Sequence, residues 1–247
     1  MTQSDIEAGL RALGVREGMM LEVHSSLRAF GYVEGGARTV IRALQNVVGG
    51  QGAIVMPAFR LSRKLPLTPE DITLGITLKI KLLSEDETST DMGLIADTFR
   101  QMPGVVTGEG CFQVSAWGKN AKRHASAGFQ DIIDHGGYAL LLGVNIYRLS
   151  AMHYVEDAMP ADIKARFAPA PEALARYPAK EWFIESFEPS AKPWYEIQSQ
   201  ACAANLIKDG MIGDSKCMFF PVKPVVELYR QALLTRPYEL YGLERKV

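Results

Sequence analysis

The order of apolar segments at the start of the chain constrains its fold more than any other feature. Residues 19–23 form an apolar run typical of a buried strand, residues 37–48 carry apolar side chains at helical spacing, and residues 53–56 form a second run that stops at Pro57. A strand, a loop, a helix and a strand within about forty residues are typical of a crossover unit, although periodicity leaves an antiparallel pairing open. The sequence therefore predicts an α/β layered fold.

Later segments extend this pattern. Ser4 and Glu7 have the spacing of a capping box, and they begin an amphipathic helix that Gly14 ends. Residues 138–144 are almost entirely apolar, as expected for a central strand that is covered on both faces. Residues 161–197 are rich in proline and aromatic residues without a clear period, and we expect them to wrap the surface. A further helix, a late strand and a closing helix are predicted at residues 92–99, 216–222 and 225–234.

Residues 59–91 interrupt the alternation. Several cations lie among apolar residues in this stretch, and the acidic run Glu85-Asp86-Glu87 follows them. We interpret the stretch as an inserted, partly solvated segment, so that residues 1–247 form a single domain with an insertion at about residues 59–91. The cations are Arg60, Arg63, Lys64, Lys79 and Lys81.

Composition excludes several classes of function. The 27 Lys and Arg residues balance 28 Asp and Glu residues, which leaves a net charge of -1 and no basic stripe, so nucleic acid is not an expected partner. The chain starts without the segments of a signal peptide, and no apolar run approaches the ~18 residues of a membrane span, which predicts a cytoplasmic protein without a membrane partner. The three widely spaced cysteines suit reduced thiols, and no metal site is expected.

The strongest candidate for chemistry follows the predicted strand at residues 138–144. On a helix, positions i and i+3 share a face, so Glu156 would lie beside His153 and orient its imidazole. Ligands of open α/β sheets gather beyond the carboxyl ends of the strands, where this segment would lie. The pair is therefore a candidate general base, and the alternative is a turn whose His and Glu side chains merely face water.

A second candidate site lies earlier in the chain. The run His24-Ser25-Ser26 follows the first predicted strand, and Gly35-Gly36 precedes a helix whose free N–H groups and positive dipole end would receive a phosphate. This pattern favours a pyrophosphate-bearing cofactor. The alternative is a turn of small residues that caps the helix.

Other readings of the polar residues are weaker. His124 and His135 lie in polar stretches, and we expect both at the surface. A Ser–His hydrolase would need a Gly-x-Ser-x-Gly elbow, which the sequence does not contain. The sequence also lacks a Gly-x-Gly-x-x-Gly motif, a Walker loop and a His-Glu-x-x-His zinc motif.

Seven groups of residues carry more information together than any of them carries alone. They are Val23-His24-Ser25-Ser26-Leu27, Gly35-Gly36-Ala37 with Ala43-Leu44, Ile54-Val55-Met56-Pro57, Asp91-Met92-Gly93-Leu94 with Phe99-Arg100, Ala116-Trp117-Gly118, Leu141-Leu142-Gly143-Val144, and His153 with Glu156. In this order and spacing the sequence resembles the aminoglycoside 3-N-acetyltransferase family, also called the antibiotic acetyltransferases. The resemblance runs from about residue 5 to residue 160 and returns faintly at residues 210–220.

The resemblance implies a fold, a co-substrate and a set of site residues. The fold is a three-layer α/β/α core, distinct from the common GNAT acetyltransferase fold, and the reaction is the attack of a small-molecule amine on the thioester of acetyl-coenzyme A (acetyl-CoA). His153 corresponds to the family's catalytic histidine and Glu156 to its accompanying acid, while His24, Ser25 and Ser26 lie near the coenzyme. The chemistry agrees, because an ammonium group cannot attack until a base removes its proton.

The sequence departs from the family pattern in one stretch. Members often read Arg-Ser-x-His-Pro-x-His-Ser before the Trp-Gly pair, whereas residues 106–113 of this chain read Val-Thr-Gly-Glu-Gly-Cys-Phe-Gln. The arginine and both histidines are missing, so this wall of the site has a different character. In addition, the segment after Pro57 is basic and apolar, where a polycationic acceptor would prefer carboxylates.

Three hypotheses about function follow. The first is an N-acetyltransferase that acts on an amine of an aminoglycoside or a related amino sugar. The second keeps the enzyme class but changes the acceptor to another small amine in biosynthesis. The third is a non-catalytic coenzyme A-binding protein, and the presence of both His153 and Glu156 argues against it. The sequence leaves the oligomeric state open, a homodimer included.

Overall fold

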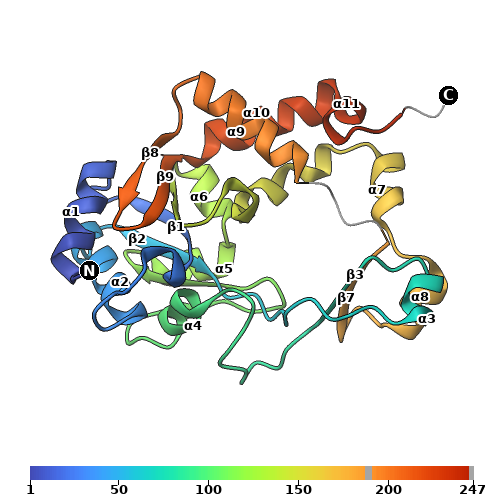
Figure 1. The fold of residues 1–247 in the computed structure, drawn as a ribbon, viewed down its shortest axis with the longest axis horizontal. Helices are drawn as coiled ribbons and strands as arrows, with labels where there is room; N and C mark the ends of the chain where they lie inside the picture. The colour runs from blue at the N-terminus through green and yellow to red at the C-terminus, as the bar shows by residue number, and fades with distance from the viewer. Residues whose placement is uncertain (187–190, 245–247) are drawn as a thin grey trace.

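The structure is a computed structural model, and it describes residues 1–186 and 191–244. A seven-stranded sheet in the order β4-β5-β2-β1-β6-β9-β8 forms its centre (Figure 1). The middle of the sheet consists of β1 (Met20–Ser25), β2 (Ala53–Pro57) and β6 (Tyr138–Leu142), and both β2 and β6 pair with β1 in parallel. The predicted crossover unit is confirmed, and its pairing is the parallel one.

The outer strands of this sheet are antiparallel. On one side, β5 (Val114–Gly118) pairs with β2, and the two-residue strand β4 (Val106–Thr107) forms the edge. On the other side, β9 (Ser215–Pro221) pairs with β6, and β8 (Lys208–Ile212) forms the edge. The predicted late strand corresponds to β9.

Helices cover both faces of the sheet. Successive side chains of a strand point to opposite faces, so Leu140 and Leu142 of β6 pack on one face and Leu141 on the other. The face of Leu140 is covered by three helices, α1 (Gln3–Leu13), α2 (Ala37–Val48) and α4 (Leu94–Arg100). The opposite face is covered by α5 (Ala121–Ala127), α6 (Gln130–Asp134), α9 (Lys192–Ala203), α10 (Val222–Thr235) and α11 (Pro237–Tyr241). The predicted three-layer α/β/α core is confirmed.

The first helix begins earlier than predicted. Thr2 is its N-cap, where the Asp5 amide donates to Thr2 Oγ1 at 3.3 Å and the Thr2 amide donates to Asp5 Oδ2 at 2.8 Å. The prediction of a Ser4–Glu7 capping box was wrong, because Thr2 and Asp5 have the same spacing and lie two residues earlier. Glu7 lies inside the helix and pairs with Arg11, one turn later.

A small lobe lies outside the main sheet, at the right of Figure 1. It consists of α3 (Pro69–Thr73), β3 (Leu78–Lys81), α8 (Pro171–Arg176) and β7 (Trp182–Glu185), and β3 pairs with β7 in a separate antiparallel sheet. The chain enters the lobe first after β2, and for a second time through α7 (Ala161–Phe167). Because its two strands are about a hundred residues apart in sequence, the lobe joins the stretch at 59–91 to a distant segment.

A buried polar cluster holds the small lobe together. Asp71 is fully buried, and it accepts hydrogen bonds from Lys79 Nζ and, at 2.5 Å, from the Tyr177 hydroxyl. A buried carboxylate needs such partners, because burial without them costs several kcal/mol. The cluster links α3, β3 and the end of α8. The assignment of a single domain with an insertion at about residues 59–91 stays a prediction.

The expectation that residues 161–197 only wrap the surface was wrong for two elements. β7 lies in a sheet, and α9 packs on the main core with Trp194, Ile197 and Ala201 buried. Within the described residues, no helix is long and apolar enough to cross a membrane.

Candidate active site

His153 and Glu156 lie on a short helix just beyond the carboxyl end of β6. The chain leaves β6 at Leu142, passes through the 3₁₀ helix η2 (Ile146–Arg148) and enters a longer 3₁₀ helix, η3 (Ser150–Ala158). His153 Nδ1 lies 3.0 Å from Glu156 Oε2. Side chains at i and i+3 eclipse each other on a 3₁₀ helix, so this geometry pairs them more directly than the α-helix expected from the sequence. The structure therefore brings the predicted pair together.

The pair leaves one imidazole nitrogen available. Because Nδ1 donates to the carboxylate, the neutral ring carries its lone pair on Nε2, which is able to accept a proton. The His153 side chain is 58% exposed and that of Glu156 29% exposed, so a small molecule can reach the ring. Partial burial acts to lower the pKa of His153, but the hydrogen bond and negative charge of Glu156 outweigh it, and the more distant carboxylates of Glu185 and Glu22 add to them. The pKa of His153 is therefore raised.

An aromatic floor lies beneath the imidazole. The Trp194 ring of α9 is almost fully buried, and its centroid lies 5.4 Å from that of His153 and 5.4 Å from that of Tyr229. The Tyr147 ring meets the edge of Trp194 at 5.8 Å. These contacts restrict the ring of His153. Sequence reasoning missed Trp194, although its spacing to Ile197 and Ala201 is helical and carried the signal.

A second histidine–glutamate pair is buried below η3. His24 Nε2 lies 2.8 Å from Glu22 Oε1, and the side chains are 7% and 0% exposed. Glu22 Oε1 also accepts the Ala151 amide at 3.1 Å, and the Ser150 amide lies 3.4 Å from His24 Nε2. The pair therefore ties β1 to the first residues of η3, two positions before His153. Sequence reasoning missed Glu22, although residues i and i+2 of a strand share a face and placed it beside His24.

The predicted coenzyme-side run His24-Ser25-Ser26 lies at the carboxyl ends of β1 and β6, beyond which His153 also lies. Ser25 ends β1, and the Ser26 amide donates to Leu142 O, at the end of β6, at 2.9 Å. The 3₁₀ helix η1 (Leu27–Phe30) follows Ser26. The His24-Ser25-Ser26 run is thus hydrogen-bonded to the strand that leads to His153.

Gly35 and Gly36 form the turn into α2. Their φ angles of 76° and 61° lie in the region that favours glycine, and a Cβ on Gly35 would lie 2.5 Å from Thr39 Oγ1. Gly36 is the N-cap of the 12-residue helix α2 and supplies no side chain to its first amides. A Cβ on Gly36 would lie 4.0 Å from the Leu27 side chain, so this turn borders the segment that follows Ser26.

The other two histidines share one carboxylate. His124 is buried, with Nδ1 2.5 Å from Asp131 Oδ2, so its predicted surface position was wrong. It lies on the face of α5 that packs inward, which its polar neighbours in the sequence conceal. His135 is 52% exposed and contacts Asp131 Oδ1 at 2.9 Å, so its predicted surface position is confirmed. In the described ranges, no group of three or more His, Cys, Asp or Glu side chains has the arrangement of a metal site.

A family model described as aminoglycoside 3-N-acetyltransferase matches residues 23–234. The chain belongs to this family. It is 28% identical to the SPbeta prophage-derived aminoglycoside N(3')-acetyltransferase-like protein YokD of Bacillus subtilis (strain 168), over 92% of this chain and 90% of that protein. It is 25% identical to aminoglycoside N(3)-acetyltransferase III of Salmonella sp., over 91% of this chain and 88% of that enzyme. The predicted family and enzyme class, an acyltransferase, are confirmed.

Solved structures of this family share the fold. The crystal structure of YokD from Bacillus subtilis has a TM-score of 0.73 at 26% identity and covers 96% of this chain and 95% of its own. The binary structure of AAC-IIIb with CoASH has a TM-score of 0.68 at 18% identity and covers 100% of this chain and 99% of its own. A gentamicin complex of the aminoglycoside acetyltransferase AAC(3)-IVa has a TM-score of 0.73 at 20% identity, covering 98% and 94%.

The stretch that departs from the family pattern carries an aromatic cluster. Phe112 is 54% exposed, and its ring meets the edges of Phe59 at 5.5 Å and Phe183 at 6.0 Å between centroids. Phe183 and Glu185 lie two residues apart on β7 and therefore on the same face, and the charge of Glu185 acts on His153. The strand that carries Phe183 therefore also carries a carboxylate that acts on His153.

A hollow of about 270 Å³ lies beside the same stretch, with carboxylates of Glu85 and Glu109 in its lining. The remaining lining residues are Arg100, Gln101, Thr107, Gly108 and Gln113. Arg60 Nη1 lies 3.2 Å from Glu85 Oε1, and Lys79 is paired with Asp71. Two of the cations that give the segment after Pro57 its basic character are therefore paired with carboxylates of the same chain.

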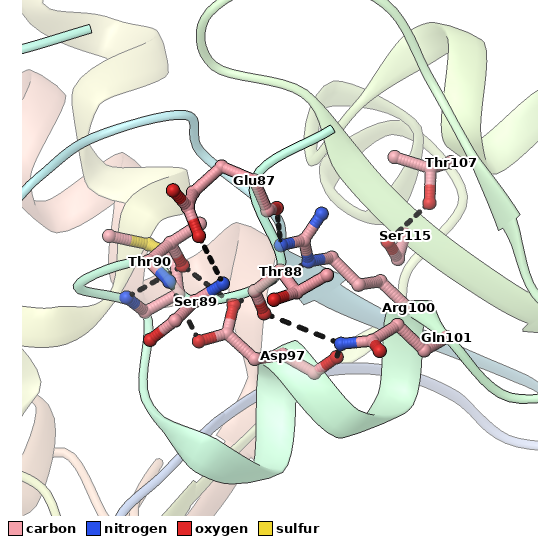
Figure 2. A network of polar contacts seen from close by, with 10 residues as sticks. Glu87, Thr88, Ser89, Thr90, Asp97, Arg100, Gln101, Thr107 and Ser115 are labelled. Atoms are coloured by element: carbon pink, nitrogen blue, oxygen red, sulfur yellow. Dashed lines mark hydrogen bonds and ion pairs between the residues drawn. The ribbon is translucent and has the colours of Figure 1, made fainter. Parts of the chain in front are cut away.

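Figure 2 shows a polar network that includes Arg100 and Gln101, two of the residues that line this hollow. The Thr90 amide and hydroxyl donate to the two carboxylate oxygens of Asp97 on α4, each at 2.8 Å. Arg100 donates to the Glu87 carbonyl, and the Gln101 amide donates to the Thr88 carbonyl at 3.3 Å. The end of the stretch at 59–91 is thereby attached to the main core.

Proposed function

We propose that this chain is an acetyl-CoA-dependent N-acetyltransferase that acylates an amine of an aminoglycoside or a related amino sugar, with His153 as the general base. One observation carries the proposal: an accessible imidazole whose Nδ1 is held by Glu156 lies just past the carboxyl end of β6. The family relationship supports the acyl transfer. The solved relatives with CoASH and with gentamicin support the donor and the acceptor.

The proposed reaction moves one proton in two steps. The acceptor attacks as its neutral amine, after its ammonium proton has been released to solvent, and its nitrogen forms a C–N bond with the thioester carbonyl. As this bond forms, His153 Nε2 accepts the proton that the nitrogen loses. Collapse of the tetrahedral intermediate breaks the C–S bond. The imidazolium of His153 then returns its proton to the departing thiolate, while Glu156 stabilises the charged ring between the two steps.

The coenzyme side is proposed to consist of His24, Ser25, Ser26, Gly35 and Gly36. The uncapped start of α2 suits a pyrophosphate, because its first amides and helix dipole favour an anion. The Ser26 amide already donates to Leu142 O, so the serine hydroxyls rather than this amide would polarise the thioester carbonyl. His24 contributes from below by supporting η3, since its ring is buried.

Turnover with a panel of amines tests the proposal directly. Purified protein is mixed with acetyl-CoA and aminoglycosides, amino sugars or simple amines, and thiol release is measured. We expect release with at least one aminoglycoside or amino sugar. Binding of coenzyme A without release on any amine would instead favour the non-catalytic coenzyme A-binding protein.

Coenzyme binding has its own test with a matched control. Coenzyme A at about 100 times its Kd should stabilise the fold by about 2.7 kcal/mol and raise the melting temperature. Gly35→Ala should weaken this shift, because the new Cβ would collide with Thr39 and distort the turn. Gly136→Ala is the control, since Gly136 has a similar φ of 70° and open space around it. Equal shifts of the melting temperature by coenzyme A in both variants would show that Gly35 is not part of the coenzyme site.

A second acceptor class is favoured by the aromatic cluster around Phe112. Phe112 is proposed to line the acceptor pocket, where an exposed aromatic ring would suit an amine on an apolar or ring-bearing molecule better than a polycation, which carboxylates would hold. Phe112→Ala should therefore change the ranking of amines and leave coenzyme affinity within a few-fold. An unchanged ranking would exclude Phe112 from the acceptor wall. Gln113 is a poorer target, because its amide reaches the Gly108 and Gly110 carbonyls and supports the loop.

A further inference from the structure

The second oxygen of Glu156 has a partner of its own. The Tyr229 hydroxyl lies 3.3 Å from Glu156 Oε1, while Glu156 Oε2 faces His153. The Tyr241 hydroxyl lies 2.6 Å from that of Tyr229. Tyr229 is fully buried on α10, and Tyr241 is nearly buried on α11. Four side chains from three separate helices thus form one continuous line of hydrogen bonds.

The chemistry of these groups fixes the direction of the hydrogen bonds. An ionised carboxylate only accepts, so His153 Nδ1 and the Tyr229 hydroxyl both donate to Glu156. The Tyr229 oxygen is then free to accept from Tyr241. Burial raises the pKa of both tyrosines far above the ordinary value, so both keep their protons at the pH where a histidine base works. Each hydrogen bond in this line therefore keeps the same donor and the same acceptor throughout catalysis.

We infer that Tyr229, supported by Tyr241, is a positioning residue that holds the Glu156 carboxylate against His153. The inference rests on the proposed function in so far as His153 is the base. Glu156 is partly exposed on a 3₁₀ helix, so its side chain would otherwise turn into water. A buried hydroxyl on Oε1 fixes the orientation of the carboxylate and directs Oε2 at the imidazole.

Other charges near His153 do not replace this contact. The carboxylates of Glu185 on β7 and Glu22 on β1 also act on the ring, but more weakly than Glu156. Trp194 and Tyr147 contribute rings without charge. Loss of the Tyr229 hydroxyl should therefore weaken the interaction between His153 and its main counter-charge.

The test is an NMR titration of the His153 ring in the 247-residue chain. The chain has four histidines, and the His153 signal is assigned by its loss in His153→Ala. Glu156→Gln should lower the pKa of His153 by about one unit, since it removes an adjacent opposite charge. Tyr229→Phe should lower it by about half a unit, and Tyr241→Phe by less. In the same variants, kcat should fall several-fold while the KM for acetyl-CoA stays unchanged.

A double mutant separates positioning from a structural effect. Because Tyr229 acts through Glu156, Tyr229→Phe should leave the pKa of His153 unchanged in the Glu156→Gln background. Tyr177→Phe is the matched control, since it removes a tyrosine hydroxyl bonded to Asp71 in the small lobe and should not affect the His153 titration.

Two results would overturn the inference. One is an unchanged His153 titration in a folded Tyr229→Phe protein, with folding checked by its melting curve. The other is a shift that adds in full to that of Glu156→Gln. Wild-type turnover in His153→Ala would instead refute the general base while leaving these titration shifts in place, so the two failures are distinguishable.

Discussion

The part of the chain that the structure describes contains two histidine–glutamate pairs, which share a chemistry and differ in their surroundings. His153 and Glu156 are 3.0 Å apart on a 3₁₀ helix, and the imidazole is open to solvent. His24 and Glu22 are 2.8 Å apart on the central strand, and both are buried. The first pair leaves a ring nitrogen accessible, whereas the second lies under the start of η3, where the Ala151 amide donates to Glu22 Oε1.

This difference shows that proximity of a histidine to a carboxylate does not by itself assign a role. A general base must reach the proton that it removes, and only the exposed pair meets this condition. A buried hydrogen-bonded pair instead acts on the geometry around it, because removal of one partner leaves the other without its hydrogen bond. This contrast supports the proposal that His153 carries the chemistry and that Glu22 and His24 support its helix.

The largest expected effect comes from removal of the exposed imidazole. His153→Ala should lower kcat by about 10²–10⁴-fold, the usual contribution of a positioned general base, with little change in stability. Thiol release with the preferred amine measures it. His135→Ala is the control, because His135 is also exposed and also paired with a carboxylate. A similar loss of activity in both variants would show that the effect is not specific to His153 and would contradict its role as the base.

Removal of the buried carboxylate should have its main effect on stability. Glu22→Ala leaves the Ala151 amide and the His24 ring without their acceptor, so the free energy of unfolding should fall by about 2–4 kcal/mol. Glu156→Ala should cost about 1 kcal/mol or less, because solvent screens its partly exposed pair with His153. The Tyr229 hydroxyl, which loses its acceptor in this variant, is still able to donate to Tyr241. Urea denaturation of both variants measures the contrast. Equal losses would contradict the assignment of support to the buried pair.

The central fold was predictable from sequence for a physical reason. Residues 37–48 and 138–144 bury nearly every apolar side chain at a regular period, and β6 lies between two strands with both faces covered. The pairing of β3 with β7 was not predictable, because it joins segments far apart in the chain. α9 was missed because its proline and aromatic residues were interpreted as an irregular segment, although Trp194, Ile197 and Ala201 have helical spacing.

The residues of the candidate site also differ in whether local sequence patterns were able to predict them. His153 and Glu156 were found because their partner lies three residues away, within reach of local spacing rules. Trp194 and Tyr229 reach the same site from helices that only the tertiary fold brings together. Glu22 was within reach of sequence reasoning, since alternate residues of a strand share a face.

The smallest expected effect is the dependence of stability on pH. The pKa of His153 is raised in the folded state, so the pair stabilises the protein fully below the unfolded value of about 6.5 and loses this contribution as pH rises through the folded pKa. The difference in unfolding free energy between wild type and Glu156→Gln should therefore be larger at about pH 5.5 than at about pH 8.5, by roughly a few tenths of a kcal/mol after screening. A larger difference at the higher pH would reverse the sign and contradict the raised pKa.

Chemical rescue tests the central claim, that the exposed histidine is the base and the buried one is not. Free imidazole is added to His153→Ala and to His24→Ala, and thiol release is followed with the preferred amine. The space left by the exposed ring is open to solvent, so imidazole should restore part of the turnover of His153→Ala in proportion to its unprotonated form, whereas His24→Ala should not respond. Rescue of His24→Ala alone, or wild-type turnover in an untreated and folded His153→Ala, would contradict the account.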